Sequence, residues 1–411
     1  MDTIFLVPGP TRLFFTTGIY YAYLLQKRFN VVLILEKGFN PEPEIIRGQI
    51  DKFKGNIKIE FIEPRNKYPY AFLLHKTAVH LFNRYQPKFT LMHNTVSFQN
   101  IYLFSESRRR KIPVLNYLNA LMTEDDEKIW NLYVIRGHNG FIKLKNYLKS
   151  IIYYRLLPLV LTHRFFYPDF DVFQGCNLAS SAKKVDRIDF LLVYSKREKE
   201  ILKRMGHKDG NIVIIQHPLE TIGTEVHQII FEDVNENDDV LVLPSTTADI
   251  NYLVERGIDI VAIENLWKEI IAVLAVNFSG KILIKLHPDL VNDPLWERII
   301  DTIVNIFKDR IVALPSLMQP NELILKSRVI VSEVSSVLWW AKFIPDKIII
   351  SFDLFNAPLG DYFKGEEGIY YFNDIEEFKK ADLKSLSYTF RNNVPDLISF
   401  LENISRIPHA R

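Results

Sequence analysis

The stretch GKILIKLHP, residues 280–288, decides the fold class because an apolar run ends there in His287-Pro288. A short apolar run bounded by Gly and Pro is typical of a strand buried in a parallel sheet. The run RVIVS, residues 328–332, repeats the pattern and is followed by Ser335 and Ser336. Ligands of open α/β sheets bind at the carboxyl ends of the strands, so both polar groups lie where a ligand is expected. We expect them on neighbouring strand ends, where they could hold a phosphate between them.

Similar runs alternate with helical patterns along the whole chain, which predicts parallel sheets joined by helical crossovers. Further strands are expected at Thr3–Val7, Asn30–Leu35, Ile57–Ile62, Phe89–His93, Ile112–Leu118, at the start of Phe190–Glu200, within Asn211–Pro218, and at Val240–Leu243, Ile311–Leu314 and Lys347–Ser351. We interpret the turn at Pro8–Thr11 as the break after the first strand.

The length of 411 residues exceeds what one hydrophobic core supports, so two domains are expected. The predicted fold class is α/β, with two Rossmann-like domains whose parallel sheets face a central cleft. The boundaries are residues 1–225 for an acceptor domain, 226–385 for a nucleotide domain and 386–411 for a terminal helix. The polar, acidic stretch Leu219–Asp239 is interpreted as the junction.

The composition excludes several classes of protein. An apolar fraction of 48% excludes a disordered chain, and 51 basic against 49 acidic residues give no argument for nucleic-acid binding. The single cysteine, Cys176, excludes an internal disulfide. No basic leader or spanning segment is visible, so a cytoplasmic chain is predicted. The histidines lack metal-ligand spacing, and the Gly-x-Gly-x-x-Gly and Walker A fingerprints are absent, so no metal and no cofactor are expected.

The polar groups at the strand ends have both a binding and an ordinary interpretation. The imidazole of His287 can donate to a phosphate oxygen, whereas many histidines in such loops only cap or pack. Ser335 and Ser336 precede the apolar run at 337–341, so they can form an anion site at a helix start or act as a simple N-cap.

Taken together, Lys285-x-His287-Pro288, Gln319–Ile324 and the SEVSS run at 332–336 resemble the nucleotide half of bacterial GT-B glycosyltransferases that use CMP-activated acidic sugars. Bacterial sialyl- and polysialyltransferases carry such HP and SS motifs, and Kdo transferases and CDP-glycerol glycerophosphotransferases are similar in pattern. The motifs cover residues 240–350. The resemblance implies a GT-B fold and transfer of a nonulosonic acid or Kdo from a CMP-sugar to a glycan, without a metal.

The resemblance also implies roles for individual residues. His287, followed by Pro288, would contact the nucleotide phosphate, and Ser335 and Ser336 would bond its oxygens. Glu322 would accept hydrogen bonds from ribose hydroxyls, as carboxylates do well, although it is equally consistent with an exposed helix glutamate. Ser245 and Thr246, after the first strand of the domain, would touch the phosphate or the sugar carboxylate, unless they form an ordinary turn.

The base that takes the acceptor proton is expected from the N-terminal domain. Asp125 and Asp126, in the acidic run 124–127, are candidates, although such runs are typical of solvated helix starts. His93, at the end of a predicted strand, is a rival base. Gly9 and Thr11, in the Pro8–Thr11 turn, would allow a phosphate or an acceptor to approach the backbone.

A basic, aromatic segment at residues 143–164 fits either a core helix or a peripheral contact with an anionic membrane that carries lipid-linked glycan acceptors. Two alternatives to sugar transfer remain. The chain could transfer a polyol phosphate from a CDP-linked donor, with His287 as the catalytic group, or it could be a non-catalytic sugar-nucleotide-binding subunit.

Overall fold

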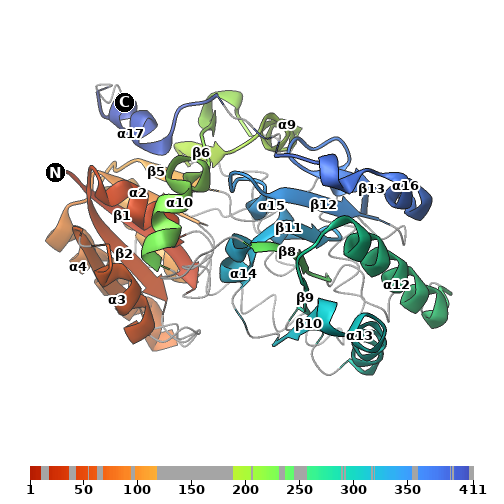
Figure 1. Ribbon diagram of the computed structural model, residues 1–411. Helices are drawn as coiled ribbons and strands as arrows, with labels where there is room; N and C mark the ends of the chain where they lie inside the picture. Colours follow the sequence, from red (N-terminus) through yellow and green to blue (C-terminus); the bar gives the residue numbers. More distant parts are fainter. Residues whose placement is uncertain are drawn as a thin grey trace. The chain divides into compact units, whose positions relative to one another are not determined.

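The computed structural model describes residues 1–10, 18–36, 43–53, 55–62, 68–93, 98–117, 188–204, 207–230, 237–244, 257–287, 290, 293–315, 318, 320–353, 360–388, 390 and 393–406. The chain divides into two compact units (Figure 1). Unit 1 comprises Met1–Ile222 and Asn393–Arg411, and unit 2 comprises Gly223–Asn392. The terminal helix α17, Leu397–Arg406, therefore belongs to unit 1, where the ring of Phe400 lies 5.2 Å from that of Phe190.

Unit 1 contains a parallel sheet of seven strands in the order β3-β2-β1-β4-β5-β6-β7. Its strands are β1 Thr3–Pro10, β2 Asn30–Glu36, β3 Ile57–Ile62, β4 Phe89–Met92, β5 Val114–Tyr117, β6 Phe190–Val193 and β7 Ile212–Ile214. Its other described helices are α2 Ile19–Gln26, α3 Pro43–Asp51, α4 Tyr68–Tyr85, α5 Phe98–Arg109, α9 Lys196–Arg204 and the start of α10, Pro218–Ile230, with a 3-10 turn at Asp209–Asn211.

The first strand continues through the turn that the sequence predicts at its end. β1 runs to Pro10, and its register with β2 shifts between Leu6 and Gly9. Beyond Val7, β1 no longer pairs with β4, so Pro8 and Pro10 lie where the strand has one neighbour and a missing N–H is tolerated. The predicted break was therefore wrong, because an irregularity in the ladder accommodates Pro8 and only β2 pairs with the strand at Pro10.

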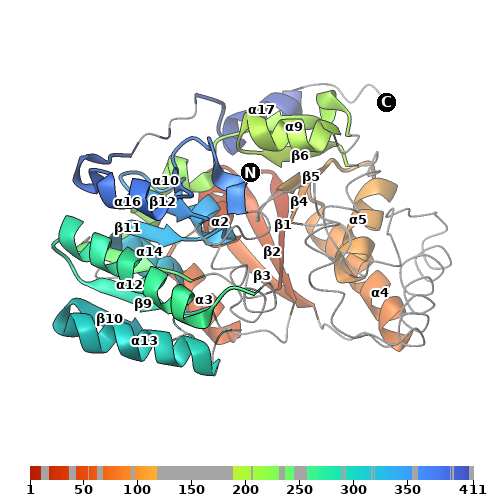
Figure 2. The ribbon, with the colours of Figure 1, turned by 90° about the vertical axis from the view of Figure 1, so that its right-hand side faces the viewer.

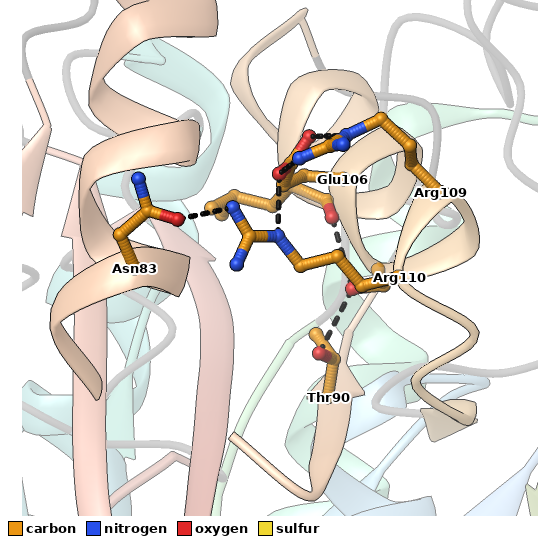
Figure 3. A network of polar contacts seen from close by, with 7 residues as sticks. Asn83, Thr90, Glu106, Arg109 and Arg110 are labelled. Carbon is orange, nitrogen blue, oxygen red and sulfur yellow. Dashed lines mark hydrogen bonds and ion pairs between the residues drawn. The ribbon is translucent and has the colours of Figure 1, made fainter. Parts of the chain in front are cut away.

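Helix α5 is joined to its neighbours by a buried carboxylate. Figure 3 shows Glu106 between the guanidinium groups of Arg109 and Arg110, with Arg110 reaching Asn83 on α4. Burial by itself raises the pKa of Glu106, but the hydrogen bonds and charges of the two arginines outweigh it and hold the pKa below its usual value. This network fastens α5 beside α4, where Figure 2 shows the two helices together.

Unit 2 contains a parallel sheet of six strands in the order β10-β9-β8-β11-β12-β13. Its strands are β8 Asn237–Val242, β9 Ile282–Lys285, β10 Ile311–Leu314, β11 Ser327–Ser332, β12 Ile348–Phe352 and β13 Tyr370–Phe372. Its described helices are the rest of α10, then α12 Ile260–Asn277, α13 Pro294–Phe307, α14 Pro320–Lys326, α15 Ser336–Ala341 and α16 Ile375–Lys380, with 3-10 turns at Lys308–Arg310, Gly360–Phe363 and Leu383–Ser385.

One face of this sheet carries the main core of unit 2. Alternate strand residues such as Val242, Ile284 and Val331 pack with residues of α12 and α13, including Trp267 and Trp296, whose rings lie 5.4 Å apart. Figure 1 places α12 and α13 on this face and α14 on the opposite one. Because strand side chains alternate between faces, the residues between the core positions point toward the α14 side.

The stretch Leu219–Asp239, which the sequence predicts as the junction, contains the division between the two units at Ile222–Gly223. Helix α10 covers Pro218–Ile230, and β8 already begins at Asn237. The helix begins because the backbone N–H of Leu219 donates to Nδ1 of His217 and that of His217 donates to Glu220, which together satisfy two N–H groups at the helix start. The prediction missed this helix because it weighed the acidic composition and overlooked the capping residues.

Candidate functional site

The order of strands in unit 2 reverses direction between β8 and β11, and such a switch point is where open α/β sheets bind ligands. The two strand ends are tied together at this point. The N–H of Leu243 donates to the carbonyl of Val331 at 2.9 Å, and the hydroxyl of Ser332 donates to the carbonyl of Leu243. The carboxyl edge of this sheet is therefore the candidate nucleotide site.

The structure separates the two motifs more widely than the sequence suggests. We expected His287 and Ser335-Ser336 at the ends of neighbouring strands, but β8 lies between β9 and β11. Two strand spacings amount to about 10 Å, so the motifs flank the switch point instead of meeting at one spot. The expectation of adjacency was wrong because the crossover connections, and not the order in the sequence, decide which strands pair.

The two serines differ in what their hydroxyls do. Ser335 is the N-cap of α15, and its Oγ accepts from the N–H of Val337 at 3.2 Å. Ser336 is the first residue of α15 and is exposed. The ordinary capping role therefore applies to Ser335, while the Ser336 hydroxyl is placed at the switch point of the sheet and open to solvent.

His287 lies two residues beyond the end of β9 and is exposed. Its carbonyl accepts from the N–H of Leu290 at 2.9 Å, which holds the turn after the strand. Pro288, Ser245 and Thr246 lie outside the described residues, so their proposed contacts with a donor remain predictions.

Glu322 lies in the first turn of α14, which follows the edge strand β10. Its Oε1 is 2.6 Å from Nζ of Lys326 one turn later, and the carboxylate is 37% exposed. An ion pair this exposed contributes little to stability, so the carboxylate can exchange the lysine for a ligand at small cost. Its ribose-binding role stays a prediction.

A row of polar side chains crosses the carboxyl edge of unit 2, and the sequence interpretation gave it no role. Ser332 of β11 pairs in register with Ser351 of β12, which pairs with Tyr371 of β13. Ser351 is fully buried, and its Oγ has no hydrogen-bond partner within the described residues. Burial, with the charges of Asp353 and Asp361, raises the pKa of Tyr371 to about 12. Ser332 is the last residue of β11 and Ser351 the residue before the last of β12, and a serine near the end of each apolar run was the signal that could have revealed this row.

Unit 1 has its own switch point, between β1 and β4, and His93 lies there. The N–H of His93 donates to the carbonyl of Val7 on β1 at 3.0 Å, and its carbonyl accepts from Asn116 at 3.1 Å. Its ring lies 6.4 Å from that of Tyr117, and the residue is 8% exposed. Gly9, the other candidate at this edge, is part of β1. Thr11, Asp125, Asp126 and the segment 143–164 lie outside the described residues.

Buried tyrosines stand beside His93 in unit 1. The hydroxyls of Tyr21 and Tyr194 are hydrogen-bonded to each other, and the ring of Tyr21 lies 4.4 Å from that of Tyr117. The ring of Tyr194 lies 4.6 Å from that of His217. Burial raises the pKa of Tyr21 and of Tyr194 well above the usual value, so both phenols are neutral. This cluster joins α2, the last residue of β5 and the residue after β6, at the carboxyl ends of these two strands.

Within the described part of the chain, no three His, Cys, Asp or Glu side chains gather as a metal site would require. Across the same residues, no helix is both long and apolar enough to cross a bilayer.

No family model matches this sequence, and no curated protein matches it. Solved structures match over nearly its whole length. UDP-GlcNAc 2-epimerase from Methanocaldococcus jannaschii aligns with a TM-score of 0.57 at 10% identity, over 98% of this chain and 100% of its own. The enzyme from Neisseria meningitidis, solved with UDP-GlcNAc bound, gives 0.50 at 14% identity, over 99% and 92%. A putative enzyme of this kind from Listeria monocytogenes gives 0.50 at 11%, over 92% and 86%.

At these identities the likeness concerns the fold. With two parallel, Rossmann-like sheets in tandem, the chain has the GT-B fold that the resemblance implied. The prediction of fold class is confirmed, whereas the resemblance to CMP-sugar transferases in particular stays a prediction.

Proposed function

We propose that the chain is a glycosyltransferase that uses a sugar nucleotide, with the nucleotide bound at the carboxyl edge of unit 2. One observation carries this proposal: the switch point between β8 and β11 has the exposed hydroxyl of Ser336 beside it, and His287 lies one strand beyond β8. The GT-B fold supports the proposal, since solved enzymes that share it are named for action on UDP-GlcNAc.

For the donor we propose a CMP-activated nonulosonic acid or Kdo. The order of Lys285-x-His287-Pro288, Glu322 and Ser335-Ser336 supports this choice. When the bond between the anomeric carbon and the phosphate oxygen breaks, negative charge develops on the departing CMP. Donors such as the His287 imidazole and the Ser336 hydroxyl stabilise that charge, which is electrostatic catalysis by groups already in place.

For the acceptor side we propose that unit 1 binds a glycan hydroxyl and supplies the base. The acceptor oxygen attacks the anomeric carbon, and its proton passes to His93 or to a carboxylate of Asp125 or Asp126. The position of His93 at the switch point of its own sheet supports the histidine. A peripheral membrane contact through residues 143–164 would bring the enzyme to lipid-linked acceptors.

A second candidate is epimerisation of a UDP-N-acetylhexosamine. The observation that favours it is the match in fold, over nearly the whole chain, to solved UDP-GlcNAc 2-epimerases. In that reaction the nucleotide site would be the same edge of unit 2, but the sugar itself would change and no acceptor would be needed.

Nucleotide preference followed by turnover separates these functions. We expect CMP to raise the melting temperature and to bind more tightly than UDP in calorimetry, and CMP-sialic acid or CMP-Kdo to be hydrolysed slowly without acceptor. A preference for UDP with epimerisation of UDP-GlcNAc supports the second candidate. Turnover of CDP-glycerol indicates polyol phosphate transfer, and CMP binding without turnover indicates a non-catalytic subunit. If no nucleotide binds, the proposal is wrong.

His287 is tested by His287→Ala, which removes the imidazole donor. We expect turnover of the CMP-sugar to fall by about 100-fold or more, as for loss of a group that stabilises developing charge. The matched control is His80→Ala, at an exposed histidine on α4 of unit 1. Equal activity of the two variants would remove His287 from the site.

A further inference from the structure

Lys285 is the last residue of β9 and is 5% exposed, at the carboxyl edge of unit 2. Its neighbours in the strand, Ile282 and Ile284, belong to the core on the α12 and α13 face, so the alternation of the strand turns Lys285 to the opposite face. In register it pairs with Leu314 of β10 on one side. Lys285 therefore lies on the same face as Ser332 and Ser351, with β8 between its strand and theirs.

The ammonium group of Lys285 is buried but has few hydrogen-bond and ion-pair partners. Its Nζ donates to the carbonyl of Leu286 at 3.3 Å, and it has no ion pair within the described residues. That carbonyl belongs to the next residue, so the side chain extends toward the carboxyl edge. Burial lowers the pKa of Lys285, because a charged ammonium is disfavoured away from water.

The other buried lysines of unit 2 are better compensated. Lys342 lies 2.5 Å from the carboxylate of Glu366, and its Nζ lies 4.9 Å from the ring centre of Phe343. Lys347 donates to the carbonyl of Leu325 at 2.8 Å. An ammonium carries three donors, and burying it without an anion is unfavourable enough that such groups are normally paired. Lys285 alone among the three has only one long contact to a neutral carbonyl.

We propose that Lys285 binds an anionic group of the ligand, so that the ligand supplies the counter-ion that the described residues do not provide. This inference rests on the proposed nucleotide site at the same edge. Two sources of anion fit a CMP-sugar: the phosphate of the nucleotide and the carboxylate of the acidic sugar. His287 follows two residues later, and the switch point lies one strand away, so the phosphate is the group that these elements would share.

Lys285→Met tests the inference because methionine keeps the length of the side chain and removes the charge. Wild type is expected to bind CMP at least 10-fold more tightly than cytidine in calorimetry. In Lys285→Met this advantage disappears, cytidine affinity is unchanged, and the melting temperature stays the same or rises. The affinities for UDP, uridine and free sialic acid are measured in parallel. If Lys285→Met loses affinity for sialic acid alone, the lysine binds the carboxylate of the sugar. Lys281→Met, an exposed lysine just before β9, is the control and should behave as wild type.

The outcomes separate the two proposals. If the affinities for CMP and for sialic acid are both equal in wild type and Lys285→Met, the role of Lys285 is overturned and the nucleotide site stands. If wild type binds none of these nucleotides, the proposed function fails, and inorganic phosphate then tests the lysine directly: stabilisation of wild type but not of Lys285→Met is expected. A second variant, Lys285→Gln, provides the same test if Lys285→Met does not fold. Loss of folding in both variants would make the lysine a structural residue and refute the inference.

Discussion

Replacing Ser335 and Ser336 one at a time distinguishes a serine that caps a helix from a serine that binds the nucleotide. In Ser335→Ala the N–H of Val337 loses its acceptor, and a lost N-cap destabilises a protein by about 1 kcal/mol. For a domain of about 150–250 residues that lowers the melting temperature by roughly 2–4 °C. Ser336 is exposed, so Ser336→Ala should change stability by less than about 0.5 kcal/mol.

CMP affinity should depend on Ser336, in contrast to stability, which should depend on Ser335. A hydroxyl that donates to a phosphate contributes about 1.5–3 kcal/mol, which corresponds to a rise of about 10- to 150-fold in the Kd for CMP. We expect this loss in Ser336→Ala, measured by calorimetry, with urea unfolding as the test of stability. The matched control is Asp374→Ala, which removes the N-cap of α16 beyond the far strand β13 and should lower stability without changing affinity. Unchanged CMP affinity in Ser336→Ala would refute the phosphate-binding role and leave the pair as a helix start.

Three further predictions concern stability. Glu106→Gln should destabilise unit 1 by about 2–3 kcal/mol in urea unfolding at neutral pH. Folding lowers the pKa of Glu106 below its unfolded value of about 4.3, so its contribution to stability is lost as the pH falls through the folded pKa. The stabilities of variant and wild type should therefore converge in acid. Gly280→Ala would bring a Cβ to 2.1 Å from the backbone oxygen of Asp238 and should cost about 1–3 kcal/mol, whereas a control Gly210→Ala meets open space and should be neutral in the same assay. Glu366→Gln leaves the buried ammonium of Lys342 without its counter-ion and should cost about 3–5 kcal/mol, and adding Lys342→Met should recover most of that loss in a double-mutant cycle; additive losses would contradict the ion pair.

Much of the fold could be predicted from local pattern. The strands at Ile57–Ile62 and Ile311–Leu314 have the predicted bounds, because a buried strand needs a continuous apolar run between residues that end it. The errors came from local signals that the prediction misjudged. β1 continues through Pro8 and Pro10, with a shift in its register with β2, and Leu219–Ile230 is helical because His217 and Glu220 cap it.

The candidate site was predictable only as a set of strand ends. The sequence places His287 and Ser335-Ser336 after buried strands, and the structure agrees that each follows the carboxyl end of its strand. The sequence could not predict that β8 lies between their strands. It also could not predict that Ser335 caps a helix while Ser336 is exposed.

The sequence by itself determined that this protein is built from parallel α/β sheets with polar groups at the strand ends, because periodicity and strand-ending residues are local properties. Only the tertiary structure decided which of those groups share an edge. Strand order depends on how the crossovers pack, and the register across several strands brings Ser332, Ser351 and Tyr371 into one row. Likewise, whether Lys285 finds a counter-ion depends on what surrounds it in space, and a buried lysine at the end of β9 is visible only once the chain has folded.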